Sequence, residues 1–93
     1  MDIQNIIETL EREYDLKFQY SHLFEDYRAK YKDITFDISI STYNTDDERH
    51  GKEFISVGWS QKSSGGGSPC DSIEEVMERF DRFIERKMQI SFF

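Results

Sequence analysis

The chain has 93 residues and a net charge of −7, from 19 acidic and 12 basic side chains. Hydrophobic residues make up 37% of the chain and aromatic residues 15%, which is enough apolar area to build one core without a metal or a disulfide. Nucleic acid and anionic lipid are disfavoured as direct ligands, because both carry the same sign of charge as the chain.

One domain over residues 1–93 is the organisation that this length predicts. The single cysteine, Cys70, has no partner for an internal disulfide, which is typical of a reducing compartment. No apolar run approaches the roughly 18 residues that cross a bilayer, and the first residues lack the build of a signal peptide. We therefore expect a cytoplasmic protein with no membrane contact.

Apolar residues recur at helical spacing over 2–14 and predict a first amphipathic helix. The next stretch fits two patterns, because residues 16–20 alternate as in a strand whereas the large residues of 20–31 recur as in a helix. We interpret it as a short extended piece followed by a second helix over 21–31, with Ser21 as its N-cap.

Period-two alternation over 34–43 and again over 53–60 predicts two strands, which the polar loop between them joins as an antiparallel hairpin. Residues 61–69 contain Gly, Ser and Pro but no large apolar side chain, a composition that predicts a flexible connector. A last amphipathic helix is expected over 72–88, where Ser72 begins a capping box.

These elements predict an α+β fold in which a small antiparallel sheet packs against amphipathic helices, in the order α-(β)-α-β-β-α. The sheet contains the hairpin 34–43/53–60, and the extended piece at 16–20 is a candidate for a third short strand. The expected core is Ile6, Leu10, Phe36, Ile38, Val57, Trp59, Val76, Phe80 and Ile84.

Catalysis needs a nucleophile, a base or paired carboxylates in one pocket, and the sequence shows no such set. Cys70 precedes the last helix, but Asp71 and Glu75 in the same turn oppose a thiolate. His22 and His50 have no spacing typical of a metal site or of a catalytic triad. We therefore expect a protein that is not an enzyme, with no catalytic residue and no cofactor.

Two polar segments resemble ligand-binding loops only in part. Residues 44–53 offer alternating oxygen ligands but lack the residue order of an EF-hand loop, so a solvated turn is the simpler interpretation. The run 65–67 of three glycines has no Lys in the position of a phosphate-binding loop, and the acids that follow it would repel an anion. We expect no metal and no phosphate at either segment.

The first helix breaks a local rule, since residues 1–15 carry five acids and one base although a helix C-terminus favours cations. Three of the acids fall on one face at i, i+3 and i+7, and such a row can imitate the phosphates of a nucleic-acid strand. The hairpin loop adds a second acidic spot if its tip lies nearby. The candidate partner-binding residues are Glu8, Glu11, Asp15, Asp46, Asp47 and Glu48. An ordinary solvated helix face is the alternative interpretation of the row.

These features predict a non-catalytic inhibitor that blocks the basic, nucleic-acid-binding groove of a protein partner by acidic mimicry. In size and charge the chain is similar to phage-encoded inhibitors such as anti-CRISPR proteins and to bacterial toxin-immunity proteins, without a shared motif. The expected partner is a protein with a basic surface, and enzymes that handle nucleic acid are the commonest class with such a surface.

The alternative function is a structural or assembly module that self-associates through exposed aromatic residues. Its candidate contacts are the tail 90–93, Tyr27 and Tyr31. The sequence leaves both a monomer and a homodimer open. Salt separates the two functions, because a charge-driven complex weakens as salt is added and an aromatic interface does not.

Overall fold

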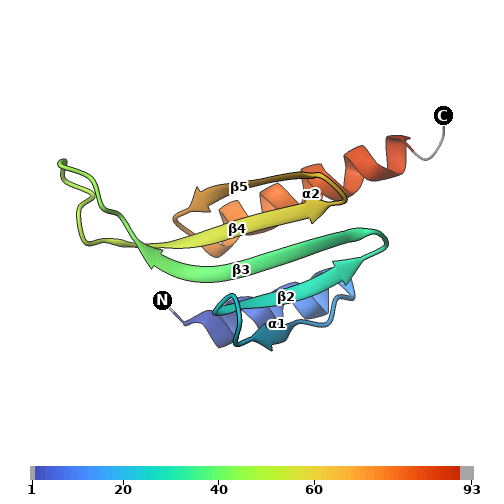
Figure 1. The fold of residues 1–93 in the computed structure, drawn as a ribbon, viewed down its shortest axis with the longest axis horizontal. Coiled ribbons are helices and arrows are strands. Elements are labelled where there is room, and N and C mark those ends of the chain that lie inside the picture. Colours follow the sequence, from blue (N-terminus) through green and yellow to red (C-terminus); the bar gives the residue numbers. More distant parts are fainter. Residues whose placement is uncertain (1, 91–93) are drawn as a thin grey trace.

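The computed structural model describes the backbone of residues 2–90 and the side chains of residues 2–84. Along this part of the chain a helix lies at each end, with five strands between them (Figure 1). The elements are α1 (Ile3–Tyr14), β1 (Gln19–Ser21), β2 (Asp26–Tyr31), β3 (Ile34–Thr42), β4 (Glu53–Gln61), β5 (Ser64–Cys70) and α2 (Ile73–Ile90). The expected α+β class with an antiparallel sheet is therefore confirmed, although the order is α-β-β-β-β-β-α.

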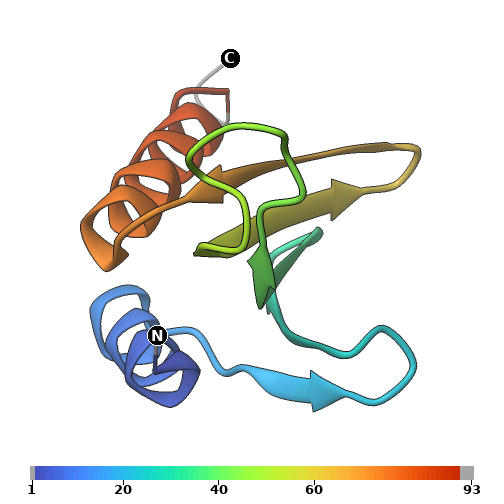
Figure 2. The same cartoon turned by 90° about the vertical axis from the view of Figure 1, so that its left-hand side faces the viewer.

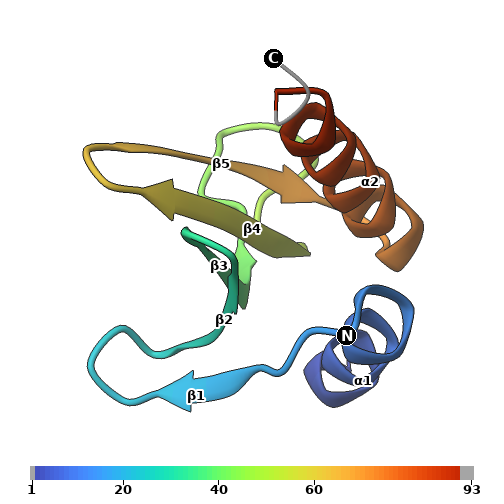
Figure 3. The same cartoon turned by 90° about the vertical axis from the view of Figure 1, so that its right-hand side faces the viewer.

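The five strands form one antiparallel sheet, in which the order in space, β1-β2-β3-β4-β5, equals the order along the chain. Each strand pairs with the one that follows it, so the sheet is a meander. Both helices cover the same face of this sheet (Figures 2 and 3). One face of the sheet is therefore buried beneath a helical layer, and no described element covers the other.

The predicted hairpin forms the centre of the sheet. β3 and β4 pair in a register that sets Phe36 opposite Trp59 and Ile38 opposite Val57. These four side chains point toward the helices, because alternate residues of a strand lie on the same side of the sheet. The connecting loop, residues 43–52, projects beyond the sheet at one end of the molecule, at the left of Figure 1.

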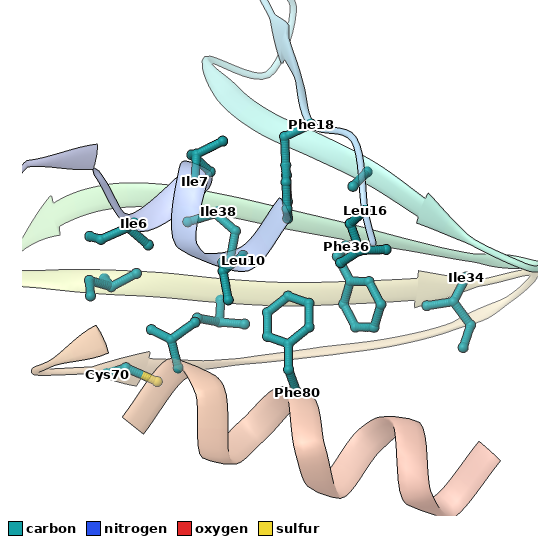
Figure 4. Packing of buried hydrophobic residues seen from close by; sticks show 14 residues of the cluster. Ile6, Ile7, Leu10, Leu16, Phe18, Ile34, Phe36, Ile38, Cys70 and Phe80 are labelled. Atoms are coloured by element: carbon teal, nitrogen blue, oxygen red, sulfur yellow. The ribbon is translucent and has the colours of Figure 1, made fainter. Parts of the chain in front are cut away.

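The hydrophobic core lies between the sheet and the two helices (Figure 4). Its buried members are Ile6, Ile7, Leu10, Leu16, Phe18, Ala29, Ile34, Phe36, Ile38, Ile55, Val57, Cys70, Val76 and Phe80. Phe80 of α2 connects the layers, since its ring centroid lies 4.5 Å from that of Phe36 and 5.3 Å from that of Tyr14. Of the nine predicted core residues, seven are buried, whereas Trp59 and Ile84 are half-buried and pack against the cluster.

Both helices begin with side-chain caps. The carboxylate of Asp2 accepts the backbone N–H groups of Gln4 and Asn5, which α1 leaves without a helical partner. At α2, the hydroxyl of Ser72 accepts the N–H of Glu75 at 3.3 Å, and the Glu75 carboxylate accepts the N–H of Asp71 at 3.0 Å. The Ser72 half of the predicted capping box is thus present, whereas the Glu75 carboxylate binds the N–H one residue before the N-cap, and α2 starts where the sequence places it.

The second helix expected over 21–31 is wrong. This stretch forms the end of β1, a turn and β2, and β2 pairs with both β1 and β3. The hydroxyl of Ser21 does accept the N–H of Phe24 at 3.3 Å, as an N-cap would, but the chain then turns through Glu25, whose φ is 55°. Leu23 is 83% exposed, so the residues that suggested a helical stripe do not share one buried face.

The Gly- and Ser-rich stretch 61–69, expected to be a loop, instead contains most of β5. A two-residue turn at Lys62 and Ser63 reverses the chain after β4, with Lys62 at a φ of 52°. Backbone pairing between β4 and β5 then runs from Gln61 and Ser64 to Ile55 and Cys70. Backbone hydrogen bonding, which requires no side chain, therefore adds a fifth strand to the sheet.

Candidate binding surfaces

The negative charge of the protein is concentrated on the helical layer. Residues 2–15 and 71–90, which form α1, α2 and their caps, carry eleven acidic and five basic side chains, a net charge of −6. Residues 16–70, which form the sheet, carry eight acidic and seven basic side chains. Because both helices lie on one side of the sheet (Figure 3), the molecule has an acidic side, hereafter the helical face.

The predicted acidic row on α1 is interrupted at its middle member. Glu8 and Asp15 are exposed, but Glu11 is half-buried and its carboxylate accepts the backbone N–H of Phe18 at 2.9 Å. This hydrogen bond holds the connection between α1 and β1 against the helix. Glu11 is therefore part of the fold, and Glu8 and Asp15 remain the exposed members of the row.

Asp15 lies at the border of the acidic surface. It occupies the C-cap of α1 in the left-handed conformation, with a φ of 53°. It also lines a wide, open basin of about 800 Å³ beside β1 and β2, to which Lys17, Arg28 and Lys30 contribute. The acidic helical face therefore changes to a locally basic surface at this end of α1.

The hairpin tip is a separate acidic spot. Asp46, Asp47 and Glu48 are exposed, but they lie on the loop that projects from one end of the molecule, whereas α1 runs toward the other end (Figure 1). The Asp47 carboxylate also accepts hydrogen bonds from the Arg49 guanidinium at 2.8 Å and from the Thr45 hydroxyl at 2.7 Å, and these bonds hold its pKa far below the usual range. The structure does not bring the tip together with Glu11 and Asp15.

Sequence reasoning missed a charged cluster on the open face of the sheet. Arg28 donates to both oxygens of the buried Asp26, at 2.9 and 3.2 Å. Its neighbour across the β2–β3 pair is Asp37, whose carboxylate lies over Gly58 so closely that a Cβ on that glycine would overlap it. Burial, and then the charge of Asp26, raise the pKa of Asp37, while Arg28 opposes the shift.

Replacing Asp37 with Asn is expected to raise the thermal midpoint at pH 7. The folded-state pKa of Asp37 lies above its ordinary value of 3.8, so the folded state binds more protons than the unfolded state and stability falls as the pH rises through that range. The gain in the variant should therefore shrink as the pH falls toward 3.8. Asp47→Asn is the control, and it should lower the thermal midpoint at pH 7, since the pKa of Asp47 is lowered in the folded state. An Asp37→Asn midpoint below that of the wild type at pH 7 would contradict the assignment.

A groove lies between β5 and α2, and it too escaped sequence reasoning, because β5 was not expected. It encloses about 330 Å³. Its apolar wall consists of Phe36, Val57, Trp59, Phe80 and Phe83. Gly66 and Gly67 of β5 form one side, and Arg79 and Arg82 of α2 form the other. The described lining therefore combines large aromatic side chains with two cations and no carboxylate.

The three groups considered for chemistry lie apart, directly after β1, on the hairpin loop and at the end of β5. Cys70 has 0% exposure, and burial raises the pKa of its thiol, which opposes a reactive thiolate. The ring of His22 contacts Tyr20 edge-on, and Nδ1 of His50 lies 2.9 Å from the Thr45 carbonyl oxygen. Within residues 2–84 there is no group of three or more His, Cys, Asp or Glu side chains that could hold a metal ion.

No protein-family model matches the chain, and no curated protein or solved structure is detectably similar to it. In the part of the chain that the structure describes, neither helix is long and apolar enough to pass through a membrane. What the fold itself defines is a five-stranded meander with a helical layer on one face, an acidic surface on that layer and an apolar groove at one edge of the sheet.

Proposed function

We propose that this protein is a non-catalytic inhibitor whose helical face occupies a basic, nucleic-acid-binding groove on a protein partner in the cytoplasm. The observation that supports the proposal is the segregation of charge, since the helical layer carries a net charge of −6 while the sheet is close to neutral. A phage-type antagonist similar to anti-CRISPR proteins and an immunity-type protein both fall within this proposal.

The acids of the helical face are available to a partner. Nine of the ten acidic residues that this layer has within residues 2–84 are exposed, and the exception is Glu11. Among the described residues, no hydrogen bond or ion pair occupies the carboxylates of Glu8, Asp15 or Glu74. A basic groove would gain attraction from such carboxylates and would exclude nucleic acid while they are bound. Attraction of this kind weakens as salt is added, because mobile ions screen exposed charges.

The double variant Glu8→Lys/Asp15→Asn is expected to weaken the partner complex by at least about tenfold at low salt while leaving the thermal midpoint nearly unchanged. Asn suits the left-handed conformation at position 15, and Glu11 is left intact because it closes the connection to Phe18. The matched control is Asp46→Lys/Glu48→Gln at the hairpin tip, which changes the net charge equally.

The partner is first captured from a lysate of the source organism with the immobilised wild-type protein and identified by mass spectrometry at low and high salt. Affinity is then measured with the purified partner, and the wild-type protein is titrated against that partner bound to nucleic acid. Release of the nucleic acid supports the proposal. A partner that retains its nucleic acid when saturated with the protein would overturn it, and a larger loss in the hairpin variant would move the interface to residues 46–48.

A second candidate function, self-association through exposed apolar residues, has one observation in its favour. The β1–β2 turn exposes Leu23 to 83% and Phe24 to 58%. The aromatic residues first considered for this role are less suitable, since Tyr27 and Tyr31 are half-buried and pack against the core. The other expected contact, the tail 90–93, lies outside the described residues except for the backbone of its first member. An association that persists at high salt would favour this function.

A further inference from the structure

β5 is the last strand of the sheet, and its outer edge has no strand beside it among the described residues. The register with β4 fixes which backbone groups point outward. Pro69 has no N–H, and its pairing with Ser56 is therefore of the type without hydrogen bonds. By alternation along the strand, Gly65 and Gly67 also pair without hydrogen bonds to β4, so their N–H and C=O groups face away from the sheet.

This edge is unusually accessible. Edge strands of natural proteins are commonly protected by charged side chains, by bulges or by proline, because an open edge pairs with other chains. In β5 only Pro69 offers such protection, at one end, and the run Gly65-Gly66-Gly67 has no side chain that could block a second strand. The part of the edge that remains open is the glycine run.

The groove beside this edge can accept a side chain of an added strand. Gly66 and Ser68 of β5 line the groove together with the aromatic wall. A strand paired with β5 would direct alternate side chains to this side of the sheet. At one such position a large apolar side chain would lie against Trp59 and Phe83, whose ring centroids are 5.0 Å apart.

The charges around the groove indicate what accompanies that apolar side chain. Arg79 and Arg82 line it, and Arg82 also pairs with Glu78 at 2.5 Å. A carboxylate of the ligand would complement these two cations. Beyond the groove the helical face is acidic, so the rest of the ligand should be neutral or basic. A second copy of this chain fits poorly, because pairing two β5 edges would bring two acidic helical faces side by side.

We propose that β5 and the adjoining groove bind an extended segment of a protein partner by strand addition. Gly65 and Gly67 pair with the backbone of the segment, a large apolar side chain enters the groove, and a neighbouring carboxylate binds Arg79 and Arg82. This site does not include Glu8 or Asp15, so the test of strand addition is independent of the test of the acidic helical face.

Gly67 offers a matched pair of variants. Gly67→Pro removes the outward N–H that an added strand needs, whereas Gly67→Ala retains it. Both variants place a Cβ at the same point, 3.3 Å from the Val57 carbonyl oxygen and on the open face, away from the groove. Pro is tolerated at this position because the missing N–H is not part of the ladder with β4.

The probe is a phage-displayed library of random peptides of about eight residues, selected on the wild-type protein. Enriched peptides should carry a large apolar residue close to Asp, Glu or the C-terminal carboxylate. For a synthetic copy of an enriched peptide, Gly67→Pro should weaken binding by about tenfold and Gly67→Ala by less than about twofold. In NMR spectra of the wild-type protein, the amide signals of Gly65 and Gly67 should shift when the peptide is added.

The carboxylate is tested with Arg79→Gln/Arg82→Gln, for which Arg12→Gln on α1 is the control. The double variant should lose affinity for the acidic peptide but not for the same peptide with its carboxylate replaced by an amide. Circular dichroism of each variant checks that the fold is retained. Absence of any peptide that prefers the wild type to Gly67→Pro would overturn the proposal. So would a wild-type dimer that Gly67→Pro dissociates in sedimentation, since a second copy would then occupy the edge.

Discussion

Replacing Phe80 with alanine is expected to lower the free energy of unfolding by about 3 to 5 kcal/mol. Phe80 is 1% exposed, and its ring contacts that of Phe36 of β3 (Figure 4) and that of Tyr14 of α1. Removing the ring leaves a cavity where both helices meet the sheet. The free-energy cost of this cavity adds to the stabilisation lost with the buried apolar area of the ring. A domain of this size is typically stable by only about 5 to 15 kcal/mol, so the variant would be close to unfolding.

Urea unfolding of the wild type and the variant measures this difference. Leu23→Ala is the control, because Leu23 is 83% exposed and its truncation should change the free energy of unfolding by less than about 0.5 kcal/mol. A loss below about 1 kcal/mol for Phe80→Ala would show that another face of α2 is packed against the sheet.

Deleting the three glycines of 65–67 is expected to abolish cooperative folding. An odd number of residues reverses the alternation of β5, so Cys70, now 0% exposed, would turn from the core to the open face. The deletion also removes about 10 Å of extended chain ahead of α2. Val76 and Phe80 could then not reach their places in the core.

The measurement is the near-ultraviolet circular dichroism of Trp59 and the aromatic core, together with the sharpness of the urea transition. The control is Gly67→Ala, whose added methyl group makes only close contact with the β4 backbone and leaves the strand length unchanged. A deletion variant that unfolds with the wild-type midpoint would mean that the stretch is a dispensable loop, as its composition alone suggests.

The elements that the sequence predicts correctly are those whose side chains repeat with one clear period. Ile6 and Leu10 on α1 and Val76 and Phe80 on α2 recur at helical spacing and are buried. The pairing of β3 with β4 was predicted for the same reason. Every second residue of each strand, such as Phe36, is apolar and has to face the core.

The β1–β2 segment could not be predicted by counting large residues, because helical and strand spacing share several of its positions. The decisive residue is Ala29, which is 3% exposed and sits between the half-buried Tyr27 and Tyr31. A small residue in the buried position makes the period-two pattern hard to see. Arg28 and Lys30, which alternate with these three residues, were the signal that could have revealed the strand.

β5 was beyond side-chain patterns altogether. Gly65, Gly66 and Gly67 have no side chain to show alternation, and they form a strand because β4 supplies a backbone ladder next to a two-residue turn. The groove between β5 and α2 was hidden for the same reason. The acidic row was visible in the sequence, but the use of Glu11 as an acceptor for Phe18 depends on how the chain turns after α1.

The meander order of the sheet has a consequence for how the chain folds. Every strand pairs with its neighbour in sequence, so the sheet can grow outward from the β3–β4 hairpin by closing one short loop at a time, and each closure costs little entropy. The most distant partners are the two helices, joined where the Tyr14 hydroxyl donates to Asp81 across 67 positions of the chain. We therefore expect α1 and α2 to dock late, on a hydrophobic surface that the sheet has already assembled, so that variants confined to the contact between the helices should speed unfolding far more than they slow folding.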